Sequence, residues 1–235
     1  MRSEVAYGNT LLSFSIERSD RKLLSIEVNP DLSINVIAPH AVEITAIEEK
    51  VLKRAKWIIK QQQFFEQFLP RTPEREYVSG ETHFYLGRKY LLRIRLSEEN
   101  MVKLKGGELI VHIKELKNTS MIKVLLNVWY YNHAKRIFEN CVKESIKEFT
   151  RYDIIENPPI TIKRMNKRWG SCTPKGRIVL NPELIKTPLM CVKYVIIHEL
   201  CHLVHPNHSK EFYELQVRMM PNWEKWKLKL EKSLI

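Results

Sequence analysis

The stretch VIIHELCHLVHPNHS, residues 195–209, holds four histidines and one glutamate in fifteen positions. The other four histidines are scattered over the remaining 220 residues of the chain. Apolar residues surround the first histidines and predict a helix that faces the protein core. Imidazole and carboxylate groups are costly to bury without partners, so the stretch indicates a functional site rather than ordinary core packing.

His198, Glu199 and His202 form an HExxH motif. On a helix, residues i and i+4 lie on the same side, one turn apart, so two imidazoles at this spacing can bind one zinc ion. Glu199 lies to the side of the pair and can take a proton from an activated water molecule without being a ligand itself. The motif therefore predicts a zinc site with a general base beside it.

A catalytic zinc usually has three protein ligands and one open position, and two histidines compete for the third place. His205 continues the helical stripe, but it starts roughly 10 Å along the axis from His198 and is poorly placed for a shared metal. Pro206-Asn207 breaks the helix and turns the chain. We therefore favour His208 as the third ligand and expect His205 to be a supporting, substrate-facing or solvated residue.

A cationic loop precedes this stretch. The segment ITIKRMNKRWGSCTPKGRIVLN, residues 160–181, carries six basic residues and no acidic one. Together with Trp169 it could hold a phosphate or a carboxylate group. It could equally be a surface hairpin with solvated charges and Trp169 packed beneath it.

Hydrophobic patterning predicts an α+β protein with a β-rich N-terminal half and a mostly helical C-terminal half. No repeat is apparent. We expect two parts, a β-rich one with a long helix over residues 1–118 and a catalytic one over residues 119–235. The expected elements are strands within 11–38, a helix from Pro39 ended by Pro70 and Pro73, strands at 77–79, 83–96 and 108–113, a helix at 119–149 capped by Thr119 or Ser120, a break at 157–159, short strands at 160–165 and 176–181, and helices over 187–205, from 209 and from 221.

The composition, 44% hydrophobic and 28% charged, is that of a globular protein. The net charge of +12 favours an anionic partner such as a nucleotide or nucleic acid, although lysines also solvate helix faces. The four cysteines form no CxxC pair and suit a reducing compartment. The sequence starts without a secretory pattern, and no stretch approaches the ~18 apolar residues of a membrane span. We therefore expect a cytoplasmic protein with no membrane partner.

Three segments together resemble the YgjP-like metallohydrolases, which are relatives of the SprT-like and WLM metalloproteases. These segments are RWGSC at 168–172, VLNPEL at 179–184 and HELCHLVHPNHSKEFY at 198–213. The segments SGETHFYLGRKYLL and VWYYNHAKRIF are also similar to the family's pattern, so the resemblance covers nearly the whole chain.

This resemblance implies a zincin-like catalytic core with His198, His202 and His208 as zinc ligands and Glu199 as the general base. It also implies that Arg168, Trp169 and Ser171 lie near the active-site cleft, and Arg168 is a candidate to stabilise an oxyanion. The leading hypothesis is a zinc metallopeptidase acting on a peptide or protein. One alternative is a nucleotide pyrophosphohydrolase of the UTP type, and another is a nucleic-acid-associated SprT-like protease.

Overall fold

The computed structural model describes residues 1–29, 31–66, 75–152, 154, 158–165 and 168–233. The chain divides into two compact units, Met1–Pro73 and Glu74–Leu234. The division that we expect after residue 118 falls inside the second unit, at the start of its longest helix. That the catalytic part begins after residue 118 stays a prediction.

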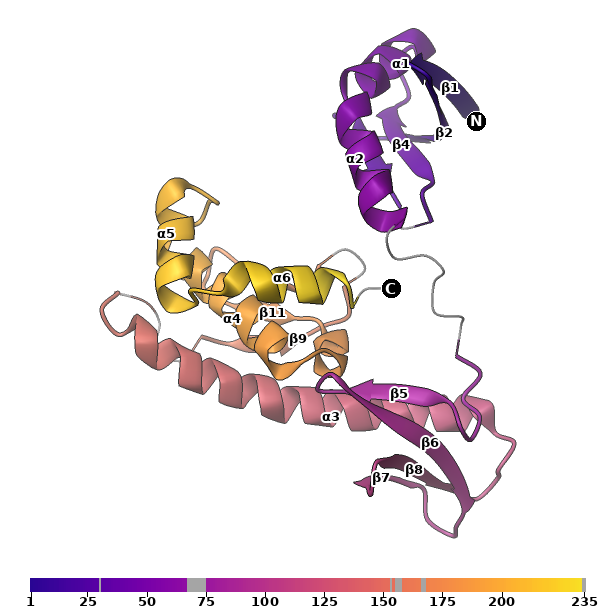
Figure 1. Ribbon diagram of the computed structural model, residues 1–235, viewed down its shortest axis with the longest axis vertical. Helices are drawn as coiled ribbons and strands as arrows, with labels where there is room; N and C mark the ends of the chain where they lie inside the picture. The colour runs from indigo at the N-terminus through magenta and orange to yellow at the C-terminus, as the bar shows by residue number, and fades with distance from the viewer. Residues whose placement is uncertain (30, 67–74, 153, 155–157, 166–167, 234–235) are drawn as a thin grey trace. The chain divides into compact units, whose positions relative to one another are not determined.

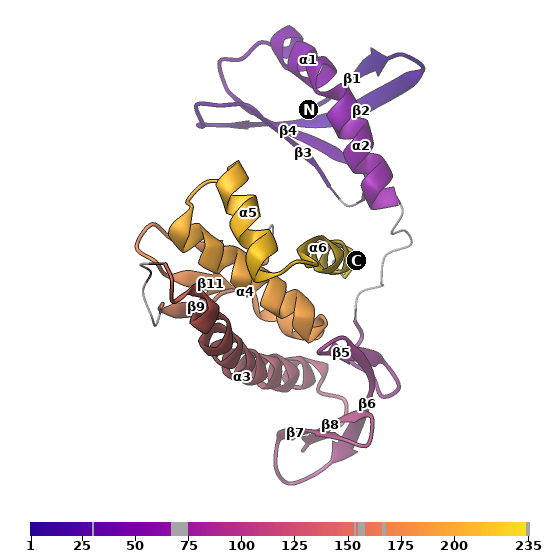
Figure 2. The ribbon, with the colours of Figure 1, turned by 60° about the vertical axis from the view of Figure 1, so that its left-hand side comes forward.

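The first unit is a four-stranded sheet covered on one face by two helices (Figures 1 and 2). Alternating residues of the second strand, Leu12, Phe14 and Ile16, point into the core between sheet and helices. The helices supply Ile47, Val51, Ala55 and Ile58, which are completely buried. The elements are β1 (Arg2–Tyr7), β2 (Thr10–Ser19), β3 (Ser25–Val28), β4 (Ile34–Pro39), α1 (Ile44–Lys53) and α2 (Ala55–Glu66), and the strand order is β1-β2-β4-β3.

The second unit begins with a sheet of the same topology. In both sheets the two outer pairs are antiparallel and the central pair is parallel, so the chain follows one strand pattern twice. This repeat is not apparent in the sequence. The second sheet consists of β5 (Thr82–Tyr85), β6 (Arg88–Leu96), β7 (Met101–Lys105) and β8 (Glu108–Ile113), in the order β5-β6-β8-β7, and is followed by the long helix α3 (Thr119–Ser145).

The remainder of the second unit is built around helix α4 (Leu189–Val204), which packs against α3, a small sheet and two later helices (Figure 1). Apolar residues surround α4 on nearly all sides, so most of its side chains are buried. The other elements are the 3-10 helix η1 (Ile146–Phe149), β9 (Ile160–Ile162), β10 (Gly170–Cys172), β11 (Ile178–Leu180), the 3-10 helix η2 (Pro182–Lys186), α5 (Lys210–Met219) and α6 (Trp223–Glu231). The small sheet has the order β10-β11-β9, which leaves β10 at an edge.

The β5–β6 turn fixes the start of α4. Leu86 and Gly87 both have positive φ angles, 48° and 77°, as a tight hairpin turn requires. Their N–H groups donate to the carbonyl oxygens of Ile185 (2.8 Å) and Lys186 (3.1 Å). A Cβ atom on Gly87 would lie 2.7 Å from Cγ of Pro188, the residue that precedes α4. The first sheet of the second unit is therefore tied directly to the helix that carries HExxH.

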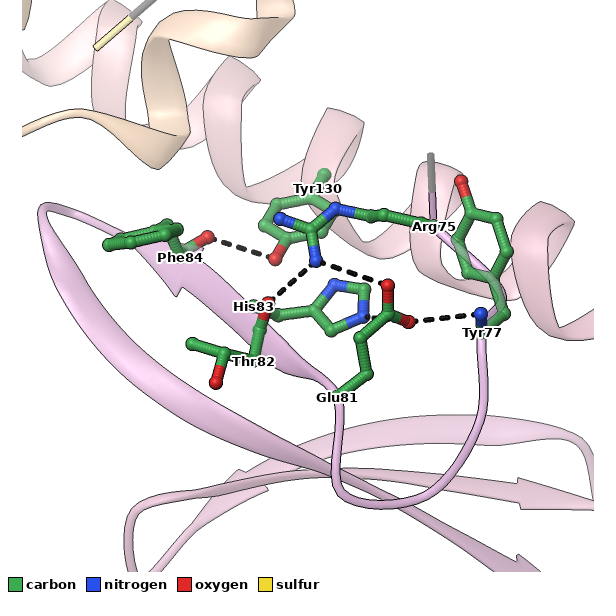
Figure 3. A network of polar contacts seen from close by, with 7 residues as sticks. All are labelled: Arg75, Tyr77, Glu81, Thr82, His83, Phe84 and Tyr130. Carbon is green, nitrogen blue, oxygen red and sulfur yellow. Dashed lines mark hydrogen bonds and ion pairs between the residues drawn. The ribbon is translucent and has the colours of Figure 1, made fainter. Parts of the chain in front are cut away.

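A polar network anchors the segment that leads into β5 (Figure 3). Arg75 donates to the carbonyl oxygen of Thr82 at 2.6 Å and lies 3.6 Å from the carboxylate of Glu81. The same carboxylate accepts from the N–H of Tyr77 and lies 3.3 Å from Nε2 of His83, whose side chain is buried. Burial and the Arg75 cation lower the pKa of His83 to about 4, although Glu81 opposes this shift.

Most of the expected elements are confirmed, including the α+β class and the helix over 187–205. Several details were wrong. Asn118, not Thr119 or Ser120, caps α3 by accepting from the N–H of Met121. Tyr77–Ser79 is not a strand, because Tyr77 has a φ angle of 59°. The first long helix is interrupted at Arg54, and its expected end at Pro70 and Pro73 lies outside the described residues. Strands β1, β7 and β10 were missed.

All four cysteines, Cys141, Cys172, Cys191 and Cys201, are free thiols. In the described part of the chain, no helix combines the length and apolar character needed to cross a membrane.

Lowering the pH is expected to destabilise the protein through His83. Its folded-state pKa of about 4 lies below the ordinary value of 6.5, so the unfolded chain takes up the proton first as the pH falls through this window. The stability is present above about pH 6.5 and falls by on the order of 2 kcal/mol towards pH 4. Urea unfolding at pH 7 and pH 5 should show a smaller pH dependence for His83→Gln than for the wild type.

The exposed His40 provides the control for that comparison. His40→Gln should keep the pH dependence of the wild type. An equal pH dependence in His83→Gln and the wild type would contradict the role of His83.

Candidate active site

Helix α4 presents His198 and His202 on one side, one turn apart, with their ring centroids 4.9 Å from each other. The helix ends at Val204, because Pro206 cannot continue it, and His205 already has an extended backbone with φ −125° and ψ 102°. The chain then turns back, and Ser209 caps α5 by accepting from the N–H of Phe212. The turn places His208 against the histidine pair.

The three imidazoles converge. Nε2 of His208 lies 3.1 Å from Nε2 of His198, and the ring centroids of His202 and His208 are 4.6 Å apart. One nitrogen from each of the three rings lies within 4.8 Å of the others, so the group could hold a metal ion. Zinc–nitrogen bonds of about 2.0–2.1 Å in a tetrahedral site place ligand nitrogens roughly 3.3 Å apart. The donor set and its spacing therefore fit zinc.

The far nitrogens of two rings have fixed partners. Nδ1 of His198 lies 3.0 Å from Oε1 of Gln216, and Nδ1 of His202 lies 3.3 Å from the backbone oxygen of His205. Because both partners accept hydrogen bonds, each Nδ1 carries the proton and each Nε2 keeps its lone pair for a metal. Burial lowers the pKa of His198 to about 4 and also lowers that of His202, so both rings are neutral at neutral pH.

Glu199 is buried beside the histidines, with only 5% of its surface exposed. Burial raises the pKa of its carboxyl group to about 7, while the Arg168 cation and the backbone N–H of Cys172 act in the opposite direction. Strand β10 approaches this carboxylate so closely that a Cβ atom on Gly170 would lie 2.7 Å from Oε1 of Glu199. The glycine of the RWGSC segment is therefore needed for Glu199 to occupy this position.

A cleft of about 1120 Å³ runs over these residues. Arg168, Trp169 and Ser171 line it, and so do the three histidines and Glu199. Arg168 is exposed, whereas Trp169 is half-buried and packs against the core, so elements of both interpretations of the loop are present. His205 is neither a cleft-lining residue nor a member of the three-histidine group among the described residues. It contributes its backbone oxygen to His202.

Sequence reasoning missed two residues that support this arrangement. Gln216 is fully buried and lies on the apolar stripe of α5 one turn after Phe212, and a polar residue on that stripe is the signal that could have found it. Asn181 is also buried, and its side chain donates to the backbone oxygens of Met165 (2.8 Å) and Arg168 (3.1 Å). Asn181 thereby holds the end of the cationic loop beside the cleft.

One comparison with known proteins shows the family. The family model for the YgjP-like metallopeptidase domain matches residues 22–233. A crystal structure of the metallopeptidase zymogen jannalysin from Methanocaldococcus jannaschii is 22% identical, covers 42% of this chain and 90% of its own, and has a TM-score of 0.36. A likeness of that extent carries no weight for the fold or the function. No curated protein matches the chain significantly.

Replacing Gly170 should disable the site without removing its histidines. In Gly170→Ala the new methyl group would meet Oε1 of Glu199 and Cγ1 of Val195 at 2.7 and 2.8 Å, so either the carboxylate or strand β10 must move. We expect hydrolytic turnover to fall by about 10²-fold or more, because a displacement of the order of 1 Å can have that effect, while bound metal stays unchanged. Ser171→Ala, on the same strand, is the matched control and should retain its metal and most of its turnover.

Tyr213 is expected to orient His208. The His208 ring stacks on Tyr213 with centroids 6.0 Å apart and meets Phe212 edge-on at 4.8 Å, and no hydrogen bond to its Nδ1 is found among the described residues. Tyr213→Ala should weaken zinc affinity by about tenfold, the lower end of the effect of losing a ligand's supporting contact. Tyr213→Phe keeps the ring and should bind zinc as the wild type does. Competition with a chromogenic chelator measures both, and equal affinities for the two variants would contradict this role.

Proposed function

Because the chain belongs to the YgjP-like metallopeptidase family, and is therefore a metal-dependent hydrolase, we propose that it is a zinc-dependent peptidase. The observation that carries this proposal is the convergence of His198, His202 and His208 in a cleft that Glu199 also lines. The finer assignments below are the three histidines as ligands, Glu199 as the general base and zinc as the metal.

The histidines supply a nitrogen-only donor set, which suits zinc better than magnesium, since magnesium prefers oxygen ligands. The chemistry that zinc supplies when bound is that of a Lewis acid, which lowers the pKa of a water molecule and polarises a carbonyl group. Gln216 and the His205 carbonyl hold two of the rings in the tautomer that this role needs.

Glu199 moves the proton. Its carboxylate accepts a proton from the attacking water and later delivers it to the leaving amine. Burial keeps its pKa near 7, so the group can both take up and release a proton near neutral pH. The positive charge of Arg168 lowers the pKa of Glu199 and so favours the ionised carboxylate. The exposed guanidinium of Arg168 is also the candidate to stabilise negative charge that develops on the substrate oxygen.

Strand β10 is suited to hold an extended peptide. It is an edge strand, it pairs with β11 on one side only, and all three of its residues line the cleft beside Glu199. A peptide can add to such an edge through backbone hydrogen bonds, which would align its carbonyl groups with the histidines.

Cationic side chains give the nucleotide alternative one observation in its favour. Arg168, Lys175 and Lys227 line the same cleft and could contact phosphates. Against that, triphosphate hydrolysis generally uses magnesium held by carboxylates, and Glu199 and Glu231 are the acidic residues among the described ones that line the cleft. We therefore favour the peptidase and keep the nucleotides as an arm of its test.

Glu199→Gln should abolish peptide hydrolysis and leave zinc in place. The amide keeps the size of the side chain but cannot take up the proton, so we expect turnover of a casein-type substrate to fall by about 10²–10⁴-fold. Metal content is measured by mass spectrometry on the same samples. If the zinc-loaded wild type cleaves no peptide, while it hydrolyses nucleoside triphosphates in a Glu199-dependent way, the site is that of a pyrophosphohydrolase.

His208→Ala tests the ligand set. Removal of a ligand should weaken zinc binding by more than the roughly 10–100-fold that loss of a supporting contact causes. His205→Ala is the matched control, because only the backbone oxygen of His205 contacts His202 and the substitution preserves it. Metal retention in His208→Ala with loss in His205→Ala would reverse the assignment.

A further inference from the structure

The first unit gathers half of its basic residues on one stretch of its helices. Residues 1–73 contain ten basic and nine acidic residues, so the unit as a whole is nearly neutral. The strand register places Glu4, Glu17 and Glu27 on the face of the sheet opposite to the core residues Leu12, Phe14 and Ile16. The helices α1 and α2 cover the other face (Figure 2). The helices also carry acidic residues, at Glu48, Glu49 and Glu66, so basic residues dominate the stretch between Glu49 and Glu66.

The outward surface of α1 and α2 between Lys50 and Lys60 is cationic, and we call it the cationic ridge. Half of the ten basic residues lie on it, all exposed, and none of them forms an ion pair within the described part of the chain. No acidic residue occurs between Glu49 and Glu66. The five residues of the ridge are Lys50, Lys53, Arg54, Lys56 and Lys60.

An aromatic side chain lies within the ridge. Trp57 is 40% exposed and lies in α2, where Lys60 follows it by three residues and neighbours it on the same helical face. Lys53 is the last residue of α1, on the other side of the interruption at Arg54. Beside Trp57, Lys56 and Lys60 join Tyr7, Ile59 and Gln63 in lining a shallow hollow of about 610 Å³.

We propose that the cationic ridge binds single-stranded nucleic acid. Phosphates would contact the lysines on either side of Trp57, and an unpaired base would stack on the exposed indole, which is how proteins bind single strands without reading their sequence. In a duplex the bases are already stacked, so Trp57 would add nothing to binding. This role is independent of the hydrolytic site, because the residues that carry it belong to the other unit.

An anionic membrane fits this surface less well. A helix that binds in the membrane interface buries a continuous apolar face among the lipids. The apolar faces of α1 and α2 are already used, since Ile47, Val51, Ala55 and Ile58 are 0% exposed in the core. Between Lys50 and Lys60 the exposed residues are the five cations, Trp57 and Leu52. This surface therefore offers charges and one aromatic ring rather than a continuous apolar face.

Fluorescence anisotropy of a labelled 20-nucleotide oligothymidylate with the full chain tests the proposal. At 50 mM salt the wild type should bind, and the affinity should fall steeply with salt, because each phosphate contact releases counterions. The triple variant Lys53→Glu, Lys56→Glu, Lys60→Glu should bind at least about tenfold more weakly, because the loss of three phosphate contacts adds to charge repulsion. The matched control is Lys103→Glu, Lys105→Glu, Lys114→Glu, three exposed lysines of the second unit. Both triples change the net charge from +12 to +6, and the control should lose no more than about twofold.

Trp57→Ala should weaken binding by about fivefold or more, within the range for loss of one stacked base, while Trp57→Phe should retain most of the affinity. Circular dichroism confirms that each variant is folded. The proposal is overturned if the wild type does not bind the oligonucleotide, if both lysine triples weaken binding equally, or if duplex is bound as tightly as single strands. Binding to phosphatidylserine vesicles, without binding to the oligonucleotide, would replace it with a membrane role.

Discussion

The burial of helix α4 is the constraint on which the active site depends. The helix is apolar on nearly all sides and is packed by α3, η2, β10, α5 and α6, so it cannot move without opening the core of the second unit. Burying His198 and Glu199 in such a helix opposes their charged forms, which the lowered pKa of the histidine and the raised pKa of the glutamate both express. The destabilisation is limited because each group has a polar partner, Gln216 for His198 and the N–H of Cys172 for Glu199. The burial of α4 therefore both stabilises the second unit and shifts the pKa values of the two site residues.

The proposed ligands differ in how firmly they are held. His198 and His202 are fixed by helix geometry and by hydrogen bonds to their outer nitrogens. His208 lies on the short turn between α4 and α5, is exposed, and is held by ring contacts to Phe212 and Tyr213. The ring contacts extend beyond Tyr213, because Tyr213 stacks on Trp223 with centroids 5.8 Å apart and Trp223 stacks on Tyr194 with centroids 6.2 Å apart. The start of α6 thus supports the third histidine through a chain of aromatic contacts.

Local patterns in the sequence were enough to predict the HExxH helix, its end at Pro206 and the approach of His208, since each depends on residues fewer than twelve positions apart. Contacts formed by distant segments could not be predicted. Strand β10 is three residues long and lies inside a cationic loop without alternation, so its place beside Glu199 follows only from pairing with β11. The role of Gln216 depends on how α5 packs against α4. The repeated strand topology could not be predicted, because the repeat consists in the order and direction of the strands. The alternation of apolar and polar residues is common to strands in general and does not reveal that order.

The two sheets of that topology differ in the contacts of their first hairpin turn, and the two units differ in the charge that they carry. In the second unit the turn of the first hairpin is committed to the start of α4, where Gly87 packs against Pro188. At the corresponding turn in the first unit, a Cβ atom on Gly8 would meet no atom within 4 Å among the residues that the structure describes. Nearly all of the net positive charge lies in the second unit, with 29 basic and 18 acidic residues over 74–235, whereas the first unit exposes five cations between Lys50 and Lys60. Trp57 among these cations is more consistent with a binding surface than with solvation alone.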